Sequence, residues 1–332
     1  MRLAAFIAYR LLGVLVVLLV IATVTYAIFY LLPTNPAQLS CGKPCTPENL
    51  ARAKEFMGVD LPWFEQLWNF LKGIVVGRTF GSGQAAVVCP SPCFGYSFQQ
   101  NATVTDLILS RFPVTASIAV GAAVVWLVFG VAGGVFSALR RGTALDRGIM
   151  TLAIAGVSTP SYLVGLLAIL LFGFTLQILP TGGYVPFTDD PVQWFLHLVL
   201  PWFTLAFISG AIYARLTRGQ MLEVMGEDYI RTARAKGLRE SQVVVRHGLR
   251  NALIPVVTIF GLDLGALLGG AVIAEKVFSM QGLGAMLIDA VHGLDLQLVV
   301  GFTLFSAFLI VIANLIVDLV YGLVDPRVKV RA

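Results

Sequence analysis

Four cysteines are the residues in this sequence whose type and spacing could do chemistry. They form two pairs with the pattern C-x3-C, Cys41 with Cys45 and Cys89 with Cys93. Four thiolates in two such pairs could hold a zinc ion, and oxidation would instead give two disulfides. Four cysteines permit three disulfide connectivities, and the spacing does not choose among them.

Other catalytic or metal-binding patterns are missing from the sequence. The three histidines, His197, His247 and His292, are scattered and have no spacing that would pair them on a metal. Lys43 is the one lysine that follows a glycine, and Pro44 comes next, so there is no phosphate-binding G-x-x-x-x-G-K-S/T loop. We therefore expect a chain that is not an enzyme and has no metal or cofactor site of its own.

The composition indicates what kind of chain carries these residues. Of 332 residues, 58% are apolar and 12% are charged, and the mean hydropathy is +0.85. Soluble domains are about 45–50% apolar and about 25% charged. This balance excludes a soluble globular protein, and it also excludes disorder, because disordered chains are charged and poor in apolar residues. A polytopic membrane protein is what remains.

Six apolar runs, uncharged apart from Asp263 in the fifth and Asp318 in the sixth, are each long enough to cross a bilayer as a helix, which takes about 20 residues. The first ends near residue 32, and the others cover 112–139, 148–188, 191–214, 251–274 and 296–324. The first run is too long for a signal peptide, so we expect it to be retained. The sequence thus predicts an all-α fold with six transmembrane helices. Pro160, in the third run, either kinks a helix or separates two half-helices.

Positive residues lie mainly on one side of these helices. With the N-terminus in the cytoplasm, 16 of the 23 Lys and Arg residues fall on the cytoplasmic side, eight of them in the loop 215–250. This arrangement follows the positive-inside rule, so both termini are predicted to be cytoplasmic and no nucleic-acid partner is expected. The predicted divisions are an N-terminus with the first helix (1–32), an extracytoplasmic segment (33–111), a membrane core (112–324) and a cytoplasmic C-terminus (325–332).

The extracytoplasmic segment contains all four cysteines. Since thiols on that side of a membrane tend to oxidise, we favour two disulfides over a zinc site, with the role of stapling the segment. The stretch from Trp63 to Val76 is rich in apolar and aromatic residues. It either lies in the membrane interface, where Trp is favoured, or packs on the outer ends of the helices.

The cytoplasmic loop 215–250 is the most polar part of the chain. Glu227 and Asp228 stand at the start of an expected helix, and Arg234 and Lys236 stand near its end, an order that suits the helix dipole. Gly237 is a plausible helix stop. The loop therefore predicts a short cytoplasmic helix, which could be either a plain surface helix or a docking element.

The motifs of this loop and of the rest of the chain resemble one family. The loop sequence Asp228-Tyr229-Ile230-Arg231-Thr232-Ala233-Arg234-Ala235-Lys236-Gly237 is similar to that of the permease subunits of bacterial ABC importers, and specifically to the B-type subunit of the dipeptide, oligopeptide and nickel family. Arg231-Thr232-Ala233 replaces the E-A-A triplet of the wider group, which favours the peptide branch. Further similar stretches are Leu31–Pro36, Gly58–Pro62, Ser158–Pro160, Leu179–Gly183, Gly269–Val272, Gly282–Gly284 and, at the end, Asp318-Leu319 and Asp325–Arg327. The cysteine-bearing outer segment is not a general feature of the family.

The resemblance implies a coupling helix and a set of partners. Docking on an ATPase subunit would involve Asp228, Tyr229, Arg231, Ala233, Arg234, Ala235, Lys236 and Gly237. The implied partners are a second, C-type permease, two ATP-binding subunits that carry ATP and Mg, and an extracytoplasmic solute-binding protein. The implied function is peptide import across the bacterial cytoplasmic membrane, with a nickel chelate or a glutathione-like compound as alternative substrates.

Asp263, Gly282 and Gly284 are the candidates for the translocation pathway. A carboxylate in mid-membrane costs about 2.5–3.5 kcal/mol on insertion scales, so Asp263 is expected to face a cavity or a partner. It would either attract the amino terminus of a peptide or form a structural hydrogen bond to the second permease. The neighbouring glycines 261, 265, 269 and 270 would let another helix approach closely. Gly282 and Gly284 would either line the outer mouth or serve loop packing.

Two other functional classes compete with the importer. An ion-gradient-driven secondary transporter often shows repeated halves and several intramembrane charges, whereas here only Asp263 and Asp318 lie within the spans. A membrane scaffold would use the outer cysteine segment as its functional part. Copurification with ATPase subunits through the loop 215–250 would separate the importer from both.

Overall fold

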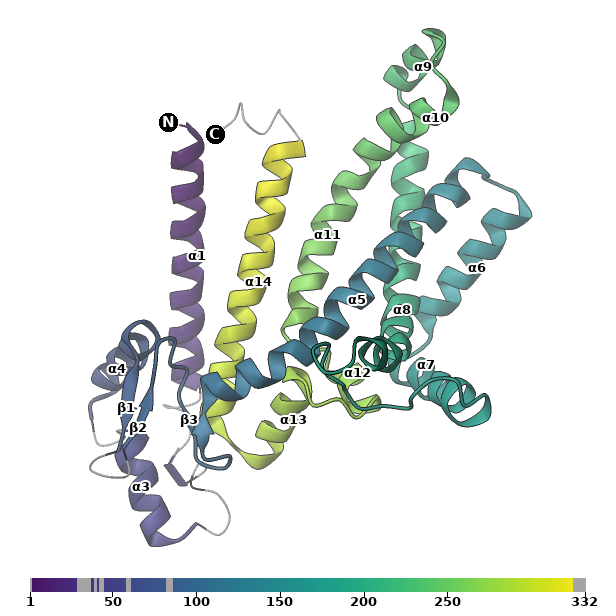
Figure 1. The fold of residues 1–332 in the computed structure, drawn as a ribbon. Helices are drawn as coiled ribbons and strands as arrows, with labels where there is room; N and C mark the ends of the chain where they lie inside the picture. The colour runs from purple at the N-terminus through teal and green to yellow at the C-terminus, as the bar shows by residue number, and fades with distance from the viewer. Residues whose placement is uncertain are drawn as a thin grey trace.

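The structure is a computed structural model that describes residues 2–28, 37–38, 41, 45–57, 61–81 and 86–324. The side chain of Asp318 and the stretches Leu31–Pro36 and Asp325–Arg327 lie outside the described part. Long helices dominate the molecule (Figure 1). They are α1 (Arg2–Tyr26), α3 (Pro47–Met57), α4 (Trp63–Val76), α5 (Val104–Leu139), α6 (Ala144–Ser158), α7 (Ser161–Ala168), η3 (Ile169–Thr175), α8 (Pro191–Met225), α9 (Asp228–Ala235), α10 (Glu240–Gln242), η4 (Val243–Leu249), α11 (Arg250–Leu268), α12 (Val272–Val277), α13 (Leu283–Gly293) and α14 (Leu296–Val324).

Several of these helices could cross a membrane. Within the described residues, four are long and apolar enough to do so, namely α5, α8, the continuous stretch Glu240–Leu268 and α14, and a bent pair provides up to one more. The apolar part of α1 that is described, Leu12–Tyr26, is shorter than a full span. The structure thus establishes a helical, multi-span fold, and the total of six spans remains a prediction.

The third predicted span is broken at Pro160. Helix α6 ends at Ser158, α7 begins at Ser161, and the two halves meet at an angle of 105°. Thr159 and Pro160 between them have extended backbone with ψ of 129° and 138°, as expected because proline disfavours the helical conformation of the residue before it. Of the two alternatives that the sequence left open, the structure has the half-helices.

Helices α5 and α8 pack tightly because glycines allow close approach. A Cβ atom at Gly130 would lie 2.7 Å from the Cβ of Tyr213, and one at Gly134 would lie 2.6 Å from the backbone oxygen of Ala214. This small-xxx-small spacing is typical of helix pairs in membranes. The side chains of Trp126 and Tyr213 fill the core beside this contact.

The outer segment departs from the all-α prediction. It contains two small antiparallel sheets, one from β1 (Arg78–Phe80) with β2 (Val87–Cys89) and one from β3 (Tyr96–Ser97) with β4 (Ala102–Thr103). Helix α5 follows β4 directly, since Thr103 Oγ1 accepts a hydrogen bond from the Asp106 amide at 3.1 Å and caps the helix. The helix therefore starts before residue 112, where the membrane core was predicted to begin.

Both disulfides are local. Cys41 is bonded to Cys45 and Cys89 to Cys93, with Cα–Cα distances of 5.5 and 5.6 Å. Each bridge closes its own C-x3-C loop, so the predicted stapling of the whole segment is wrong. The segment is attached to α14 instead, because the Ser97 hydroxyl donates to Asp295, and the Tyr96 amide donates to Gln297 Oε1 at 3.2 Å.

The two ends of the molecule differ in what they carry. Helices α9 and α10 project beyond the other helices at one end, where α1 starts and α14 finishes (Figure 1). Helices α3 and α4 and the small sheets lie at the opposite end (Figure 1). This arrangement is the one that the predicted orientation requires, with the start of α1, the end of α14 and the basic loop on one side and the cysteine segment on the other.

Candidate functional site

The projecting loop is supported by α8. That helix continues to Met225, beyond the predicted span end at residue 214, so Arg215 and Arg218 lie within it. The loop itself begins at Gly226, which ends α8. Because α8 runs unbroken from Pro191 to Met225, the loop is continuous with a helix that is long and apolar enough to cross a membrane.

Helix α9 has well-defined ends. Glu227 occupies its N-cap position and Asp228 its first turn, so both acids lie at the positive end of the helix dipole. At the other end Gly237 has a φ of +77°, its amide donates to the Arg234 oxygen at 2.9 Å, and the Leu238 amide donates to the Ala233 oxygen at 3.5 Å. This pair of bonds is the Schellman motif, which uses glycine because φ is positive there. Gly237 thus ends the helix as the sequence predicted.

Packing and polar contacts hold α9 against the rest of the loop. Ile230 and Ala233 are buried in a small cluster with Val243. Arg234 donates to Glu240 in bidentate geometry, with Nη2–Oε1 and Nε–Oε2 distances of 2.7 and 3.1 Å. The Glu240 carboxylate raises the pKa of Arg234, which therefore stays charged. These contacts join α9 to α10 and to the start of η4 within the loop.

A second anchor joins α9 to the start of α11. The Asn251 side-chain amide donates to the Tyr229 hydroxyl at 2.8 Å, and that hydroxyl donates to the His247 backbone oxygen at 3.4 Å. Tyr229 is still 41% exposed. Helix α9 is therefore connected to both membrane helices that flank the loop.

The eight predicted coupling residues fall into two groups. Ala233 is buried and serves internal packing. The others are exposed on the projecting unit, and Asp228 and Arg231 are bonded to each other at 3.4 Å. A partner would therefore contact the exposed group, which comprises Asp228, Tyr229, Arg231, Arg234, Ala235, Lys236 and Gly237.

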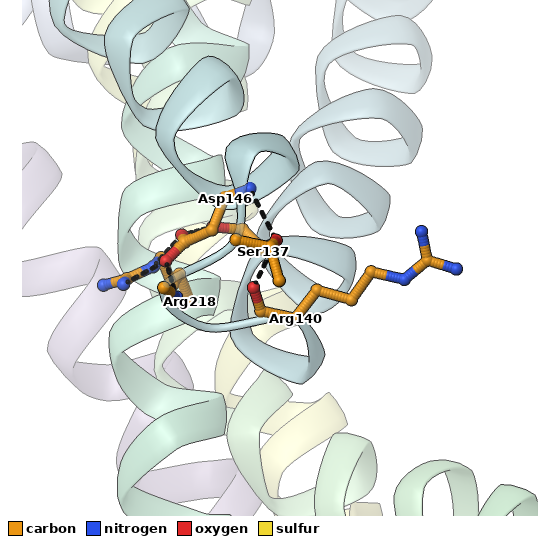
Figure 2. A network of polar contacts seen from close by, with 6 residues as sticks. Ser137, Arg140, Asp146 and Arg218 are labelled. Atoms are coloured by element: carbon orange, nitrogen blue, oxygen red, sulfur yellow. Dashed lines mark hydrogen bonds and ion pairs between the residues drawn. The ribbon is translucent and has the colours of Figure 1, made fainter.

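A buried polar network lies farther along α8. Arg218 Nε donates to Asp146 Oδ1 at 2.8 Å and Nη2 to Oδ2 at 3.0 Å, and the Gly142 amide donates to Oδ2 at 2.8 Å (Figure 2). The Ser137 hydroxyl of α5 donates to the same carboxylate. Asp146 is 4% exposed. The network joins α5, α6 and α8. It could not be predicted, because the sequence shows Arg218 only as one of the positive residues of the cytoplasmic side and gives no signal that pairs it with Asp146.

Asp263 lies on α11, where its Oδ2 accepts a hydrogen bond from the buried Tyr213 hydroxyl at 2.9 Å. The Asp263 side chain remains exposed on this chain. The helix that the neighbouring glycines admit is α14 of the same chain, since Cβ atoms at Gly261 and Gly265 would contact Val317 and Ala313. Asp263 is thus oriented by its own chain and still accessible from outside it.

Gly282 and Gly284 are both buried against α12. A Cβ at Gly282 would lie 2.6 Å from each carboxylate oxygen of Glu275, and one at Gly284 would lie 2.8 Å from the backbone of Val272. In the described structure these glycines permit close packing, and their place at the outer mouth of the pathway stays a prediction.

Glu275 organises this region, and sequence analysis did not single it out. It is fully buried and accepts hydrogen bonds from the Thr115 hydroxyl at 2.7 Å, the Ala285 amide at 2.7 Å and the Ala271 amide at 3.2 Å. Burial raises the pKa of its carboxyl, although these donors act in the opposite direction. The Leu283 amide in turn donates to Thr115 at 2.8 Å. One carboxylate therefore ties α5, α12 and α13 together.

Comparison with known families decides the identity. Residues 130–330 match the family described as binding-protein-dependent transport system inner membrane component, and residues 3–119 match its N-terminal family. The chain belongs to this family. The resemblance to the permeases of ABC importers is thereby confirmed.

Curated relatives of this permease cover nearly its whole length. A putative peptide transport system permease protein of Brucella abortus (strain 2308) is 39% identical over 94% of this chain and 95% of its own length. The glutathione transport system permease protein of Escherichia coli (strain K12) is 35% identical over 97% and 98%. Both names agree with the dipeptide and oligopeptide branch of the family that the sequence indicated.

A solved structure supports the fold. The permease is similar to a chain of the MetNI methionine ABC transporter in an inward-facing conformation, with a TM-score of 0.52 and 18% identity over 67% of this chain and 97% of that one. Together with the multi-span helical architecture, family membership makes the permease a multi-pass transport component of a bacterial inner membrane. As the permease of an ABC importer, it works with ATPase and permease subunits.

Proposed function

We propose that this chain is the B-type permease of an ATP-driven peptide importer, and that α9 docks on an ATP-binding subunit. The observation that carries the proposal is the projecting loop at the end of α8, where Arg234 pairs with Glu240 while Asp228 and Arg231 remain exposed. Supporting it are relatives named for peptide and glutathione transport.

The proposed mechanism is alternating access. Two ATP-binding subunits hold ATP and Mg, and their ATP-driven closure pushes α9 and opens the pathway outward. ATP hydrolysis then returns the pathway to its starting state. The contact of α9 with the starts of both η4 and α11 favours this role, since a push on α9 reaches α8 and α11 together. The chain itself performs no chemical step in this scheme.

The remaining parts of the assembly follow from the same proposal. A second, C-type permease completes the pathway, and an extracytoplasmic solute-binding protein delivers the peptide on the side of the cysteine segment. Both termini are cytoplasmic. Asp263 faces the pathway and attracts the amino terminus of the peptide, with its carboxylate oriented by Tyr213.

Charge reversal on α9 tests the docking. Arg234→Glu combined with Lys236→Glu should weaken copurification of the ATP-binding subunits and abolish peptide-stimulated ATP turnover in the reconstituted complex. Arg140→Glu combined with Arg141→Glu, which makes the same charge change at two exposed arginines of the α5–α6 turn, is the matched control and should leave both unchanged. Full peptide-coupled ATP turnover in the double variant would show that α9 is not the coupling element.

A swap separates docking from loop rigidity. Arg234→Glu with Glu240→Arg rebuilds the ion pair within the loop but leaves its surface charges exchanged. If Arg234 contacts the partner directly, the swapped protein stays defective in copurification. Recovery by the swap would instead mean that Arg234 acts only by holding the loop together.

A further inference from the structure

Helix α4 has three different faces. The first consists of Leu67, Phe70 and Ile74, at positions i, i+3 and i+7, which share one side of a helix. These residues pack in a cluster with Ala22 and Tyr26 of α1 and with Val300 and Leu304 of α14. Tyr26 also donates a hydrogen bond to Gln66 at 2.8 Å. This face fixes α4 at the outer ends of two long apolar helices.

The second face is apolar and exposed. Phe64, Trp68 and Val75, at i, i+4 and i+11, are 55%, 66% and 74% exposed. The partly buried Leu71, at i+7, borders them and packs on the cluster of the first face. Burying a side chain of this size stabilises a protein by about 1.5–3 kcal/mol relative to leaving it in water. Exposure of an aromatic stripe to water would therefore be costly.

The third face is polar and borders the second. It carries Glu65, Asn69 and Lys72, again at i, i+4 and i+7, and both charged residues are exposed. This order of faces suits a helix that lies in a membrane surface, because one side meets acyl chains while the adjacent side meets water.

We propose that α4 lies in the plane of the extracytoplasmic interface of the inner membrane. Phe64, Trp68 and Val75 then lie in the lipid, and Glu65 and Lys72 lie in water. The position of α4 favours lipid as the occupant of the apolar face. Its first face rests on the last turns of α1, whose neighbouring residues Val20 and Val24 are themselves half exposed. The apolar face of α4 thus continues the exposed apolar surface of α1 at the level where tryptophan is favoured.

This placement also determines where the following hairpin sits. Gly77 ends α4 and β1 begins at Arg78, and the Ser91 hydroxyl donates to the Ile74 oxygen at 3.2 Å. The β1–β2 sheet with the Cys89–Cys93 bridge is therefore held next to the membrane surface. The interfacial helix anchors the outer segment independently of any transport role.

Spin labels on α4 test the proposal. Single cysteines are introduced by Phe64→Cys, Trp68→Cys and Val75→Cys, and on the polar face by Glu65→Cys and Lys72→Cys as matched controls. Labelling is selective because the four native cysteines are bonded in pairs. The full chain, purified with its copurifying subunits, is reconstituted in vesicles of phosphatidylcholine and phosphatidylglycerol, and collisions with oxygen and with a water-soluble nickel chelate are measured.

The pattern of collisions decides the outcome. Labels at 64, 68 and 75 should collide with oxygen and lose contact with the nickel chelate, and labels at 65 and 72 should behave in the opposite way. Nickel contact at all five positions would place the apolar face in water and overturn the proposal. Immobile labels shielded from both reagents at 64, 68 and 75 would mean that a protein covers this face, which also overturns it. Since three positions probe the apolar face, failure of one variant to fold leaves two that decide.

Discussion

The guanidinium of Arg218 binds both carboxylate oxygens of Asp146, at 2.8 and 3.0 Å, and thereby fastens α6 to α8. A bidentate pair fixes geometry as well as charge. Helix α8 leads directly into the loop that carries α9. The pair therefore also connects α6, the first half-helix of the broken third span, to the helix that carries the loop. Motion of the loop should therefore move α6 with α8 as one body.

Asp146→Asn should lower the midpoint of thermal unfolding by several degrees. The substitution leaves the guanidinium of Arg218 without a counter-charge in a largely buried site, and an unpaired buried charge is strongly destabilising. Unfolding of the detergent-purified chain, followed by a thiol-independent probe such as intrinsic fluorescence, measures the midpoint. Asp189→Asn, at an exposed loop position, is the control. An equal midpoint for both variants would show that the pair is not a structural fastener.

Glu275→Gln should destabilise the permease by about 1–3 kcal/mol, the cost of one unsatisfied buried group. The carboxylate accepts hydrogen bonds at both oxygens, from Thr115 and Ala271 at one and from Ala285 at the other. In either orientation of an amide, its nitrogen faces a backbone N–H and one bond is lost. Denaturant unfolding measures the loss. Glu65→Gln, on the polar face of α4, is the control and should leave the free energy of unfolding unchanged. An unchanged free energy of unfolding for Glu275→Gln would contradict the hydrogen bonds that this carboxylate accepts.

The same residue predicts a pH dependence. Because burial raises the pKa of Glu275 above its ordinary value of 4.5, the folded state holds its proton to higher pH than the unfolded state. Protonation of Glu275 therefore contributes to the free energy of unfolding. This contribution is fully present below pH 4.5 and is lost as the pH rises through the raised pKa. The stability difference between the native chain and Glu275→Gln should therefore shrink as the pH rises above 4.5. A difference that grows with pH would mean that the hydrogen bonds outweigh burial.

The sequence predicted the elements whose signals are local. The apolar run 296–324 coincides with α14, and Gly237 follows the end of α9 because glycine readily adopts the positive φ that is needed there. The end of α8 was missed because Arg215 and Arg218 interrupt the uncharged run, although a helix that projects into water can carry charges. The choice at Pro160 needed the structure, since proline is compatible with both a kink and a break.

Contacts between distant residues could not be predicted. Thr115 and Glu275 are separated by 160 positions, and Arg218 and Asp146 by 72. A single sequence, read without an alignment of its relatives, contains no signal for such pairs. The cysteine pairing was also open, because the spacing allows all three connectivities. The structure decides the pairing by placing the two C-x3-C loops in separate clusters.

The bridges predict a specific peptide map. Tryptic digestion without reductant should give one peptide with an internal Cys41–Cys45 bridge and another with an internal Cys89–Cys93 bridge, because each bridge closes a short local loop. Mass spectrometry of the native chain measures this, and a reduced, alkylated sample is the control. A linked peptide that joins Cys41 or Cys45 to Cys89 or Cys93 would refute the local pairing.

Gly282→Ala should sharply reduce the stability of the permease, although alanine suits the backbone there. Gly282 has a φ of −89°, so the conformation is open to any residue, and only space is limiting. The added Cβ would sit 2.6 Å from both oxygens of Glu275, so the carboxylate must move away from Thr115 or from Ala285.

Gly219→Ala is the matched control, since a Cβ at that α8 position meets nothing within 4 Å. Because alanine is better than glycine within a helix by about 0.8–1.0 kcal/mol, Gly219→Ala should be neutral or stabilising. If both alanine variants unfold at the midpoint of the native chain, the close packing of Gly282 on Glu275 does not hold in solution.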